Sequence, residues 1–172
     1  AKRILEDFQP TYLRRWRTGM ARKLGWPTTT EIEPALINEW LDILAADSLD
    51  YTAAMRGLSQ AISGTFPPIF KRIADKNRFQ AWLQTWRTAL VNSGIEQHEA
   101  IRTMNAANPI YIPRNHLVEE ALELAVVHHD LTAFETLLDR VRSPYEPLDT
   151  ASKYAQAAPL DFTRQYKTFC GT

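Results

Sequence analysis

Apolar residues recur every three or four positions along most of this 172-residue chain, and that period is the strongest constraint on its fold. The spacing places apolar side chains on one face of successive helices. Isolated glycines and prolines interrupt it, which predicts several separate helices. We therefore predict an all-α fold, an irregular multi-helix domain of about seven to eight helices with an extended C-terminal tail. The predicted helices cover approximately residues 5–24, 33–46, 50–62, 69–75, 79–90, 96–106, 113–129 and 131–141.

The aromatic residues follow the same period. Four of the five tryptophans fall on the apolar faces, which predicts packing in the core rather than a platform for stacking ligands. Pro10 lies within the first predicted helix, and we expect it to kink or restart that helix because proline lacks an N–H group. The short segment 110–112 is β-like but too short to build a sheet. The tryptophans expected in the core are Trp16, Trp40, Trp82 and Trp86.

Charge is balanced overall but uneven along the chain. Twenty basic and 20 acidic residues give a net charge of zero, which provides no general attraction to nucleic acid or to an anionic membrane. Residues 1–23 hold seven basic and two acidic residues, whereas residues 24–50 hold six acids and no lysine or arginine. We expect the first two helices to lie side by side so that these charges pair. The basic segment around Trp16 resembles nucleic-acid binders, but a buried tryptophan with a solvated or acid-paired basic face fits the apolar period better.

The sequence indicates neither a membrane span nor a secretory signal, because no apolar run approaches the roughly 20 residues that a bilayer requires. We therefore expect no membrane and no nucleic acid among the partners. The first residue is alanine rather than methionine, and we interpret the chain as a piece of a longer protein. A bacterial cytoplasmic location is expected, or a mitochondrial one if the protein is eukaryotic.

Candidate catalytic and metal-binding residues do not form a recognisable set. His116 and Glu120 have helical spacing, but zinc needs three or four ligands. The single cysteine, Cys170, cannot form an intramolecular disulfide, and no histidine lies within forty residues of it to activate the thiol. The six glycines are isolated and form no phosphate-binding loop. The residues alone therefore indicate an all-α module to which we assign no catalytic, cofactor-binding or metal-binding residue.

The segment MNAANPIYIPRNHLVEEALELA, residues 104–125, resembles the C-terminal region of the selenoprotein O family. That family carries an Asn-Pro-x-Tyr-x-x-Arg-Asn-(Tyr/His)-Leu motif that leads into a helix. Weaker resemblances occur in the same order as in the family, at MARKLGWPT (20–28), LAADSLDYTAAMRGLSQ (44–60) and RSPYE (142–146). Together they cover essentially the whole chain, although the resemblance assigns no role to the motif. The residues that match the motif are Asn108, Pro109, Tyr111, Arg114, Asn115, His116 and Leu117.

The resemblance implies a function for a longer parent protein rather than for these residues alone. Members of the family have a kinase-like core that transfers AMP from ATP to protein hydroxyl groups, with Mg²⁺ or Mn²⁺. That core lies N-terminal to the region matched here, so the chain is expected to be a helical accessory domain, residues 1–142, followed by a tail, residues 143–172. The fragment alone is not expected to be catalytic. Its expected partner is the kinase-like core of the same polypeptide, and the parent is expected to act on protein substrates.

Cys170 acquires a role through the same resemblance. Family members end in a selenocysteine or cysteine followed by two small residues, and Cys170-Gly171-Thr172 occupies that place. The resemblance implies redox control, in which the terminal thiol pairs with a cysteine of the kinase-like core. Two alternatives remain open: an exposed thiol without a role, and a self-standing helical interaction module without catalysis. In the second case the basic first helix or the Asn-Pro-x-Tyr segment would bind a partner protein.

Overall fold

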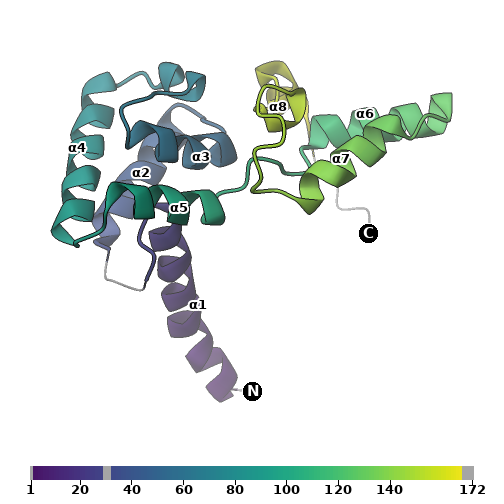
Figure 1. The fold of residues 1–172 in the computed structure, drawn as a ribbon. Coiled ribbons are helices and arrows are strands. Elements are labelled where there is room, and N and C mark those ends of the chain that lie inside the picture. Colours follow the sequence, from purple (N-terminus) through teal and green to yellow (C-terminus); the bar gives the residue numbers. More distant parts are fainter. Residues whose placement is uncertain (1, 29–31, 168–172) are drawn as a thin grey trace. The chain divides into compact units, whose positions relative to one another are not determined.

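The computed structural model describes residues 2–28 and 32–167, and all regular structure within these residues is helical (Figure 1). The prediction of an all-α, multi-helix fold is therefore confirmed. None of the described helices is both long and apolar enough to cross a membrane. With η marking a 3-10 helix, the elements are α1 (Lys2–Lys23), α2 (Pro34–Ala46), α3 (Tyr51–Ala61), η1 (Pro68–Arg72), α4 (Lys76–Asn92), α5 (Gln97–Ala107), α6 (Asn115–His128), α7 (Thr132–Arg142), η2 (Lys153–Ala155) and α8 (Leu160–Gln165).

The chain divides into two compact units, Ala1–Pro109 and Ile110–Thr172. Unit 1 contains α1 to α5 with η1, and unit 2 contains α6 to α8 with η2. The predicted domains, residues 1–142 and 143–172, rest on the loss of helical period after α7 and stay a prediction. In the structure, the described part of the tail contains η2 and α8 and belongs to the same compact unit as α6 and α7.

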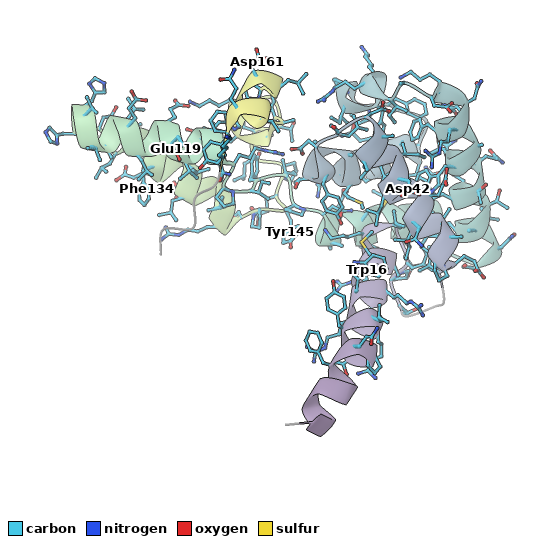
Figure 2. The ribbon with its side chains drawn as sticks, turned by 180° about the vertical axis from the view of Figure 1, so that it is seen from behind. Trp16, Asp42, Glu119, Phe134, Tyr145 and Asp161 are labelled. Carbon is cyan, nitrogen blue, oxygen red and sulfur yellow. The ribbon has the colours of Figure 1, made fainter. Side chains whose placement is uncertain are left out.

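The first helix runs without a break through Pro10, so the expected restart of the helix at this proline is wrong. A proline removes one backbone hydrogen bond, and a helix of 22 residues keeps enough others to continue. Among its described side chains, from Phe8 onward, the apolar stripe is covered only toward the C-terminal end of the helix. Leu24 is fully buried, and Trp16, midway along the helix, is partly buried against the core (Figure 2). Phe8 and Tyr12, nearer the N-terminus, are 66% and 54% exposed.

Three stacked tryptophans lie at the centre of the core of unit 1, as their positions on the apolar stripes predicted. The ring centroids of Trp40 and Trp82 lie 4.6 Å apart, and those of Trp82 and Trp86 lie 5.5 Å apart. The indole N–H of Trp82 donates to the carbonyl of Leu36 at 2.9 Å. That of Trp86 donates to the carbonyl of Leu24 at 2.8 Å. These bonds offset the cost of burying a polar indole nitrogen.

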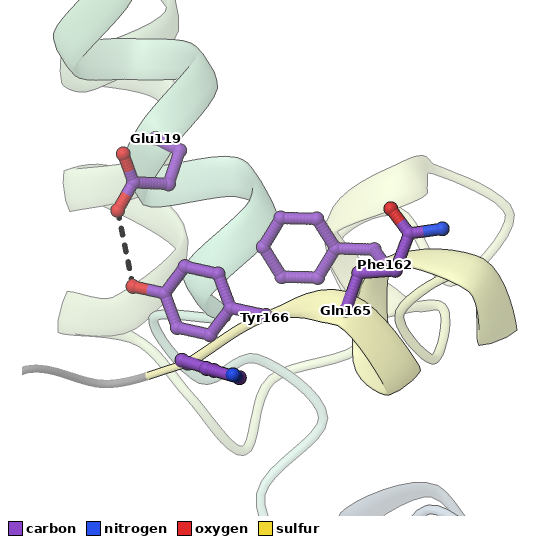
Figure 3. Close-up of a pocket in the computed structure, with 5 residues that line it drawn as sticks. Glu119, Phe162, Gln165 and Tyr166 are labelled. Atoms are coloured by element: carbon purple, nitrogen blue, oxygen red, sulfur yellow. Dashed lines mark hydrogen bonds between the residues drawn. The ribbon is translucent and has the colours of Figure 1, made fainter.

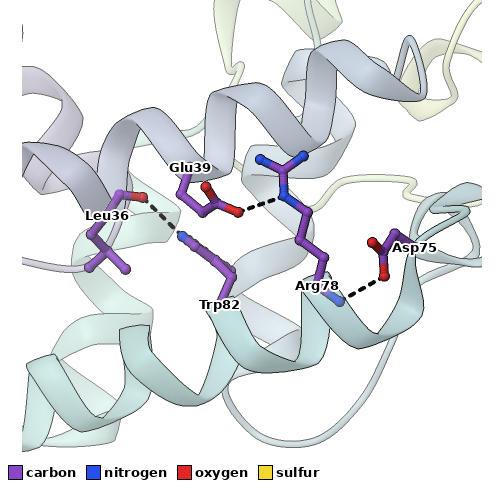
Figure 4. A network of polar contacts seen from close by, with 5 residues as sticks. All are labelled: Leu36, Glu39, Asp75, Arg78 and Trp82. Carbon is purple, nitrogen blue, oxygen red and sulfur yellow. Dashed lines mark hydrogen bonds and ion pairs between the residues drawn. The ribbon is translucent and has the colours of Figure 1, made fainter.

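The charges of α2 pair with α4, which corrects the expectation that the first two helices lie side by side. α1 packs mainly on α5, and α2 packs mainly on α4. Glu39 of α2 accepts a hydrogen bond from Nε of Arg78 on α4 at 2.6 Å, which lowers the pKa of Glu39 (Figure 4). Asp75 caps α4 by accepting from the backbone N–H of Arg78 at 2.9 Å. Hydrophobic burial decides the pairing of helices, because exposed ion pairs contribute under about 1 kcal/mol.

Gly57 allows η1 to approach α3 closely. A Cβ atom at this position would lie 2.8 Å from Cγ of Pro67 and 3.1 Å from Cζ of Phe70. The absence of a side chain lets the ring of Phe70 pack edge-on against Trp40, with 6.0 Å between ring centroids. A larger residue at position 57 would therefore push η1 away from the tryptophan core.

Unit 2 is a helical hairpin with a tail that returns to it. α6 ends at His128, next to the predicted end near residue 129, and the capping residue His129 has a left-handed φ of +53°. The carboxylate of Asp130 accepts from the N–H of Thr132, the first residue of α7, at 2.9 Å. α6 and α7 pack against each other. The buried residues in the described part of unit 2 are Ile110, Tyr111, Arg114, Leu117, Ala121 and Leu137.

Candidate functional site

The Asn-Pro-x-Tyr-x-x-Arg-Asn-His motif spans the boundary between the two compact units. Asn108 and Pro109 follow α5 at the end of unit 1, whereas residues 110–116 belong to unit 2. Each half of the motif is fixed within its own unit by a separate set of contacts. The motif therefore provides two anchors, one in each unit.

Asn108 is fully buried in unit 1 and bonds to Lys23 of α1 in both directions. Its Nδ2 donates to the backbone carbonyl of Lys23 at 2.9 Å, and Nζ of Lys23 donates to its Oδ1 at 3.2 Å. The same ammonium donates to the carbonyl of Ala107 at 3.0 Å. Asn108 thereby joins the end of α1 to the end of α5, although Lys23 lies 85 positions earlier in the sequence.

Arg56 of α3 binds the same end of α5. Its Nη1 donates to the carbonyls of Asn105 and Asn108, at 2.8 and 2.9 Å. The last carbonyls of a helix have no partner within it and carry partial negative charge, so cationic side chains satisfy them well.

Lys23 also lies over the ring of Tyr51, with Nζ 5.7 Å from the centroid. Burial lowers the pKa of Lys23, because desolvation disfavours the charged form.

Tyr111 provides the anchor in unit 2. Its buried side chain accepts, through the hydroxyl, a hydrogen bond from the backbone N–H of Asp149 at 2.8 Å. The guanidinium of Arg140 lies over its ring, 5.9 Å from the centroid. The backbone N–H groups of Ile110 and Tyr111 donate to the carbonyl of Pro144, at 2.7 and 3.3 Å. Tyr111 therefore ties the start of unit 2 to the segment that follows α7.

The four segments that resemble the selenoprotein O family meet at these two anchors. The segment around Lys23 and the segment around Arg56 both bond to Asn108 in unit 1. The segment that contains Pro144 bonds to Tyr111 in unit 2. Lys23, Arg56 and Pro144 were not predicted from the sequence as partners of the motif. Their positions in the three weaker resemblances could have pointed to them, since each of those segments supplies a contact to the segment 104–125.

The remaining motif residues begin α6. Arg114 is buried at the position before the helix, and its carbonyl accepts from the N–H groups of Leu117 and Val118 at 2.9 and 3.0 Å. Asn115 is exposed, and His116 is partly buried. Burial, and then the positive charge of Arg114, lowers the pKa of His116. Of the three side chains, only Arg114 is enclosed by the fold.

The tail packs on α6 through aromatic rings (Figure 3). Phe162 of α8 lies against His116, with 5.6 Å between ring centroids, and stacks on Tyr166 at 4.8 Å. The hydroxyl of Tyr166 donates to Oε1 of Glu119 at 3.0 Å, which raises the pKa of Tyr166. His116 therefore contacts the tail. The pair of Glu119 and Tyr166 could not be predicted from the sequence, because nothing in their spacing connects them.

An open pocket lies beside these rings. Its described side chains offer a carboxylate, a phenol, an amide and an ammonium group, all of which can form hydrogen bonds to a polar ligand. Across residues 2–28 and 32–167, no group of three or more His, Cys, Asp or Glu side chains lies close enough to hold a metal ion. The predicted redox residue, Cys170, lies outside the described residues. The pocket is lined by Glu119, Phe162, Gln165, Tyr166 and Lys167.

Comparison with known proteins agrees with the resemblance. The family model described as protein adenylyltransferase SelO matches residues 1–142. Proteins described as protein nucleotidyltransferase YdiU match the whole chain: that of Chromobacterium violaceum is 34% identical over 172 residues, and that of Agrobacterium fabrum is 36% identical over 172 residues. That of Mycolicibacterium paratuberculosis is 40% identical over 178 residues. The chain spans only 36%, 35% and 34% of the lengths of these relatives.

Proposed function

Because this chain belongs to the SelO family of protein adenylyltransferases, we propose that it is the helical C-terminal accessory domain of a longer adenylyltransferase. A kinase-like core outside these residues would transfer AMP from ATP to Ser, Thr or Tyr hydroxyl groups of protein substrates. ATP and Mg²⁺ or Mn²⁺ would bind in that core, so we assign no catalytic, cofactor-binding or metal-binding residue to this chain. We place the parent protein in the cytoplasm.

The observation that carries this proposal is the coverage of the relatives. They match the whole chain at 34–40% identity, yet the chain makes up 34–36% of each. About two thirds of each relative therefore lies outside the matched region. We place the nucleotide-binding and catalytic groups there.

We propose that the motif anchors the helices of this accessory domain and takes no part in AMP transfer. The amide of Asn108 and the hydroxyl of Tyr111 are buried, and both bond to backbone groups of the chain itself. Buried polar groups satisfied in this way are typical of a structural role. The cations that bind the end of α5 support the same role, since they complete a helix terminus.

We further propose that Cys170 controls the parent enzyme by forming a reversible disulfide with a cysteine of the kinase-like core. Forming that bond removes two electrons and two protons from the two thiols, so an oxidant such as oxidised glutathione must accept them. Support comes from the contacts of Phe162 and Tyr166 with α6. These two residues precede Cys170 by only a few positions in the sequence, and they hold that part of the tail on the helix. A held tail lowers the entropic cost of presenting its end to a partner.

A second candidate is a helical interaction module without catalysis, which the N-terminal half of α1 favours. Its side chains Phe8, Tyr12 and Leu13 are 66%, 54% and 40% exposed. Arg14 and Arg15 are also exposed, and neither forms an ion pair with a described residue. Such a surface fits a partner protein that is acidic and partly apolar.

AMP transfer is tested with the polypeptide encoded by the complete reading frame. The protein is incubated with Mg²⁺ or Mn²⁺, a cell extract as the source of substrates, and ATP labelled on either the α- or the γ-phosphate. Relative to the extract alone, we expect the added protein to increase label on protein from the α-phosphate and not from the γ-phosphate. Label from the γ-phosphate alone would indicate a kinase. A reading frame that encodes only these helices would contradict the proposed enzyme and favour the second candidate, the interaction module without catalysis.

Redox control is tested separately with Cys170→Ser in the same polypeptide. AMP transfer by the unmodified protein should change on treatment with oxidised glutathione and recover with a reductant. The Cys170→Ser variant should respond to neither, whereas Thr172→Ser, which keeps the thiol, should behave as the unmodified protein. An unchanged oxidant response in Cys170→Ser would overturn the role of this cysteine.

A further inference from the structure

α6 carries apolar residues on two faces, but the structure covers only one of them. Leu117 and Ala121 are buried. Val118, Leu122 and Val126 follow at intervals of four residues, which places them in a row along a second face of the same helix. We call these three residues the outer row of α6.

The outer row becomes more exposed toward the end of the hairpin. Val118 is half-buried, Leu122 is 51% exposed and Val126 is 73% exposed. The tail contacts α6 through other positions, namely His116, Glu119 and Glu120. No described element of unit 2 therefore covers the outer half of this row.

The described part of unit 2 has only a small hydrophobic core to hold its helices together. Five hydrophobic residues of its described part are buried, far fewer than in the core of unit 1. Units of about 60 residues are marginal even with an ordinary core, because their surface is large relative to their volume. An exposed apolar row on such a unit is typical of a surface that another part of a protein covers.

We propose that the outer row of α6 is the surface on which the remaining part of the longer polypeptide packs. This inference rests on the proposed function, since it requires that the chain be part of a larger protein. The length of the relatives supplies the occupant: about two thirds of each lies outside the region matched here.

The charges beside the row define the chemistry of the occupant. Glu119 and Glu123 border the row, one position after Val118 and Leu122. Glu119 already accepts a hydrogen bond from Tyr166, whereas Glu123 is exposed and forms no ion pair with a described residue. The surface that packs here is therefore apolar, with a lysine or arginine opposite Glu123.

Thiol labelling in the complete polypeptide tests the proposal. A cysteine is introduced by Val126→Cys in the Cys170→Ser background, and Val127→Cys serves as the matched control. Val127 is 62% exposed and lies one position further along α6, outside the row. The rate of maleimide labelling at each site is measured by mass spectrometry, relative to the same protein unfolded in urea.

We expect labelling after Val126→Cys to be at least about a hundredfold slower than in the unfolded protein, and labelling after Val127→Cys to be within about tenfold of it. Adding Glu123→Lys should speed labelling at position 126, whereas Glu135→Lys on α7 should not. Equally fast labelling at 126 and 127 would overturn the proposal. Slow labelling at 126 that becomes fast on dilution would also overturn it, because the occupant would then be a second copy of the protein.

The same preparations are assayed for AMP transfer, which keeps the two proposals apart. Protection at position 126 in a polypeptide that transfers no AMP would refute the proposed enzymatic function and leave the docking surface standing. AMP transfer with fast labelling at 126 would refute the docking surface alone.

Discussion

The two compact units hold their helices by different means. The described part of unit 1 buries 24 hydrophobic residues in one cluster, with three stacked tryptophans among them, whereas the described part of unit 2 buries five. Unit 2 relies instead on single polar and ring contacts, such as those of Tyr111 and Phe162. A change in unit 1 should therefore be felt throughout that unit, and a change in unit 2 should free one segment. All five tryptophans of these 172 residues lie in unit 1, so the indole fluorescence of this chain reports on that unit alone.

The largest effect is expected from the tryptophan stack. Trp86→Ala removes a fully buried ring and its bond to Leu24, which should lower the free energy of unfolding of unit 1 by about 3–5 kcal/mol. Val91→Ala, at a 73% exposed position of the same helix, should stay within about 0.5 kcal/mol. Urea unfolding followed by fluorescence measures both. A loss under about 1 kcal/mol for Trp86→Ala would show that the core is less tightly packed than described.

The anchor of unit 1 should come next. Asn108→Ala leaves the backbone carbonyl of Lys23 and the Lys23 ammonium without their buried partner, at an expected cost of about 1–3 kcal/mol. Asn115→Ala changes the exposed asparagine of the same motif and should cost less than about 0.5 kcal/mol. The same urea titration compares them. Equal costs would mean that burial does not distinguish the two asparagines.

A smaller and local effect is expected for the anchor of unit 2. Tyr111→Phe removes the hydroxyl that accepts from the N–H of Asp149, which should weaken that part of the tail by about 1 kcal/mol. Hydrogen exchange at the Asp149 amide should become faster, while the fluorescence transition of unit 1 stays unchanged. Tyr145→Phe, at a 45% exposed ring, is the control. A shift of the unit 1 transition by Tyr111→Phe would contradict the separation of effects.

The smallest effect concerns pH. The pKa of His116 is lowered from its ordinary value of 6.5, chiefly by burial, so the folded unit favours the neutral ring. The contribution of the neutral His116 ring to the stability of the folded unit is therefore present above pH 6.5 and is lost as the pH falls through the folded-state pKa. Arg114 and Lys153 lower the pKa as well, whereas Glu120 opposes them. Protection of the Tyr166 amide, measured as its hydrogen-exchange rate relative to the intrinsic rate at the same pH, should therefore fall on acidification.

The matched control for the pH effect is His116→Gln, which removes the titrating ring. Exchange at the Tyr166 amide should then lose the part of its pH dependence that exceeds the intrinsic chemistry of exchange. If both proteins showed the same profile, the packing of Phe162 on His116 would have no influence on the tail.

Local features of the fold could be predicted from the sequence, and features that depend on distant neighbours could not. The helical period located the tryptophans of the core, because each stripe is read within a few turns. The same period did not show that the stripe of α1 is covered at Leu24 and open at Phe8, since coverage depends on where α5 lies. It also could not pair Glu39 with Arg78, because hydrophobic packing of α2 on α4 decides that contact.

The candidate site followed the same division. The resemblance identified Asn108 and Tyr111, but it did not show what they bind. Their partners are backbone groups and cations from other segments, and a contact between Lys23 and Asn108 spans 85 positions. The role of His116 depends on Phe162, which returns to α6 only once the tail has folded back.

The length of that span has a consequence for the order in which unit 1 assembles. Closing a loop of 85 residues is entropically costly, so the bonds between Lys23 and Asn108 should form after the helices themselves. The final turn of α5 would then be the last part of unit 1 to become ordered. Asn108→Ala should accordingly leave the rate of folding nearly unchanged and accelerate unfolding. Asn108 would then slow the unfolding of unit 1 without belonging to its folding nucleus.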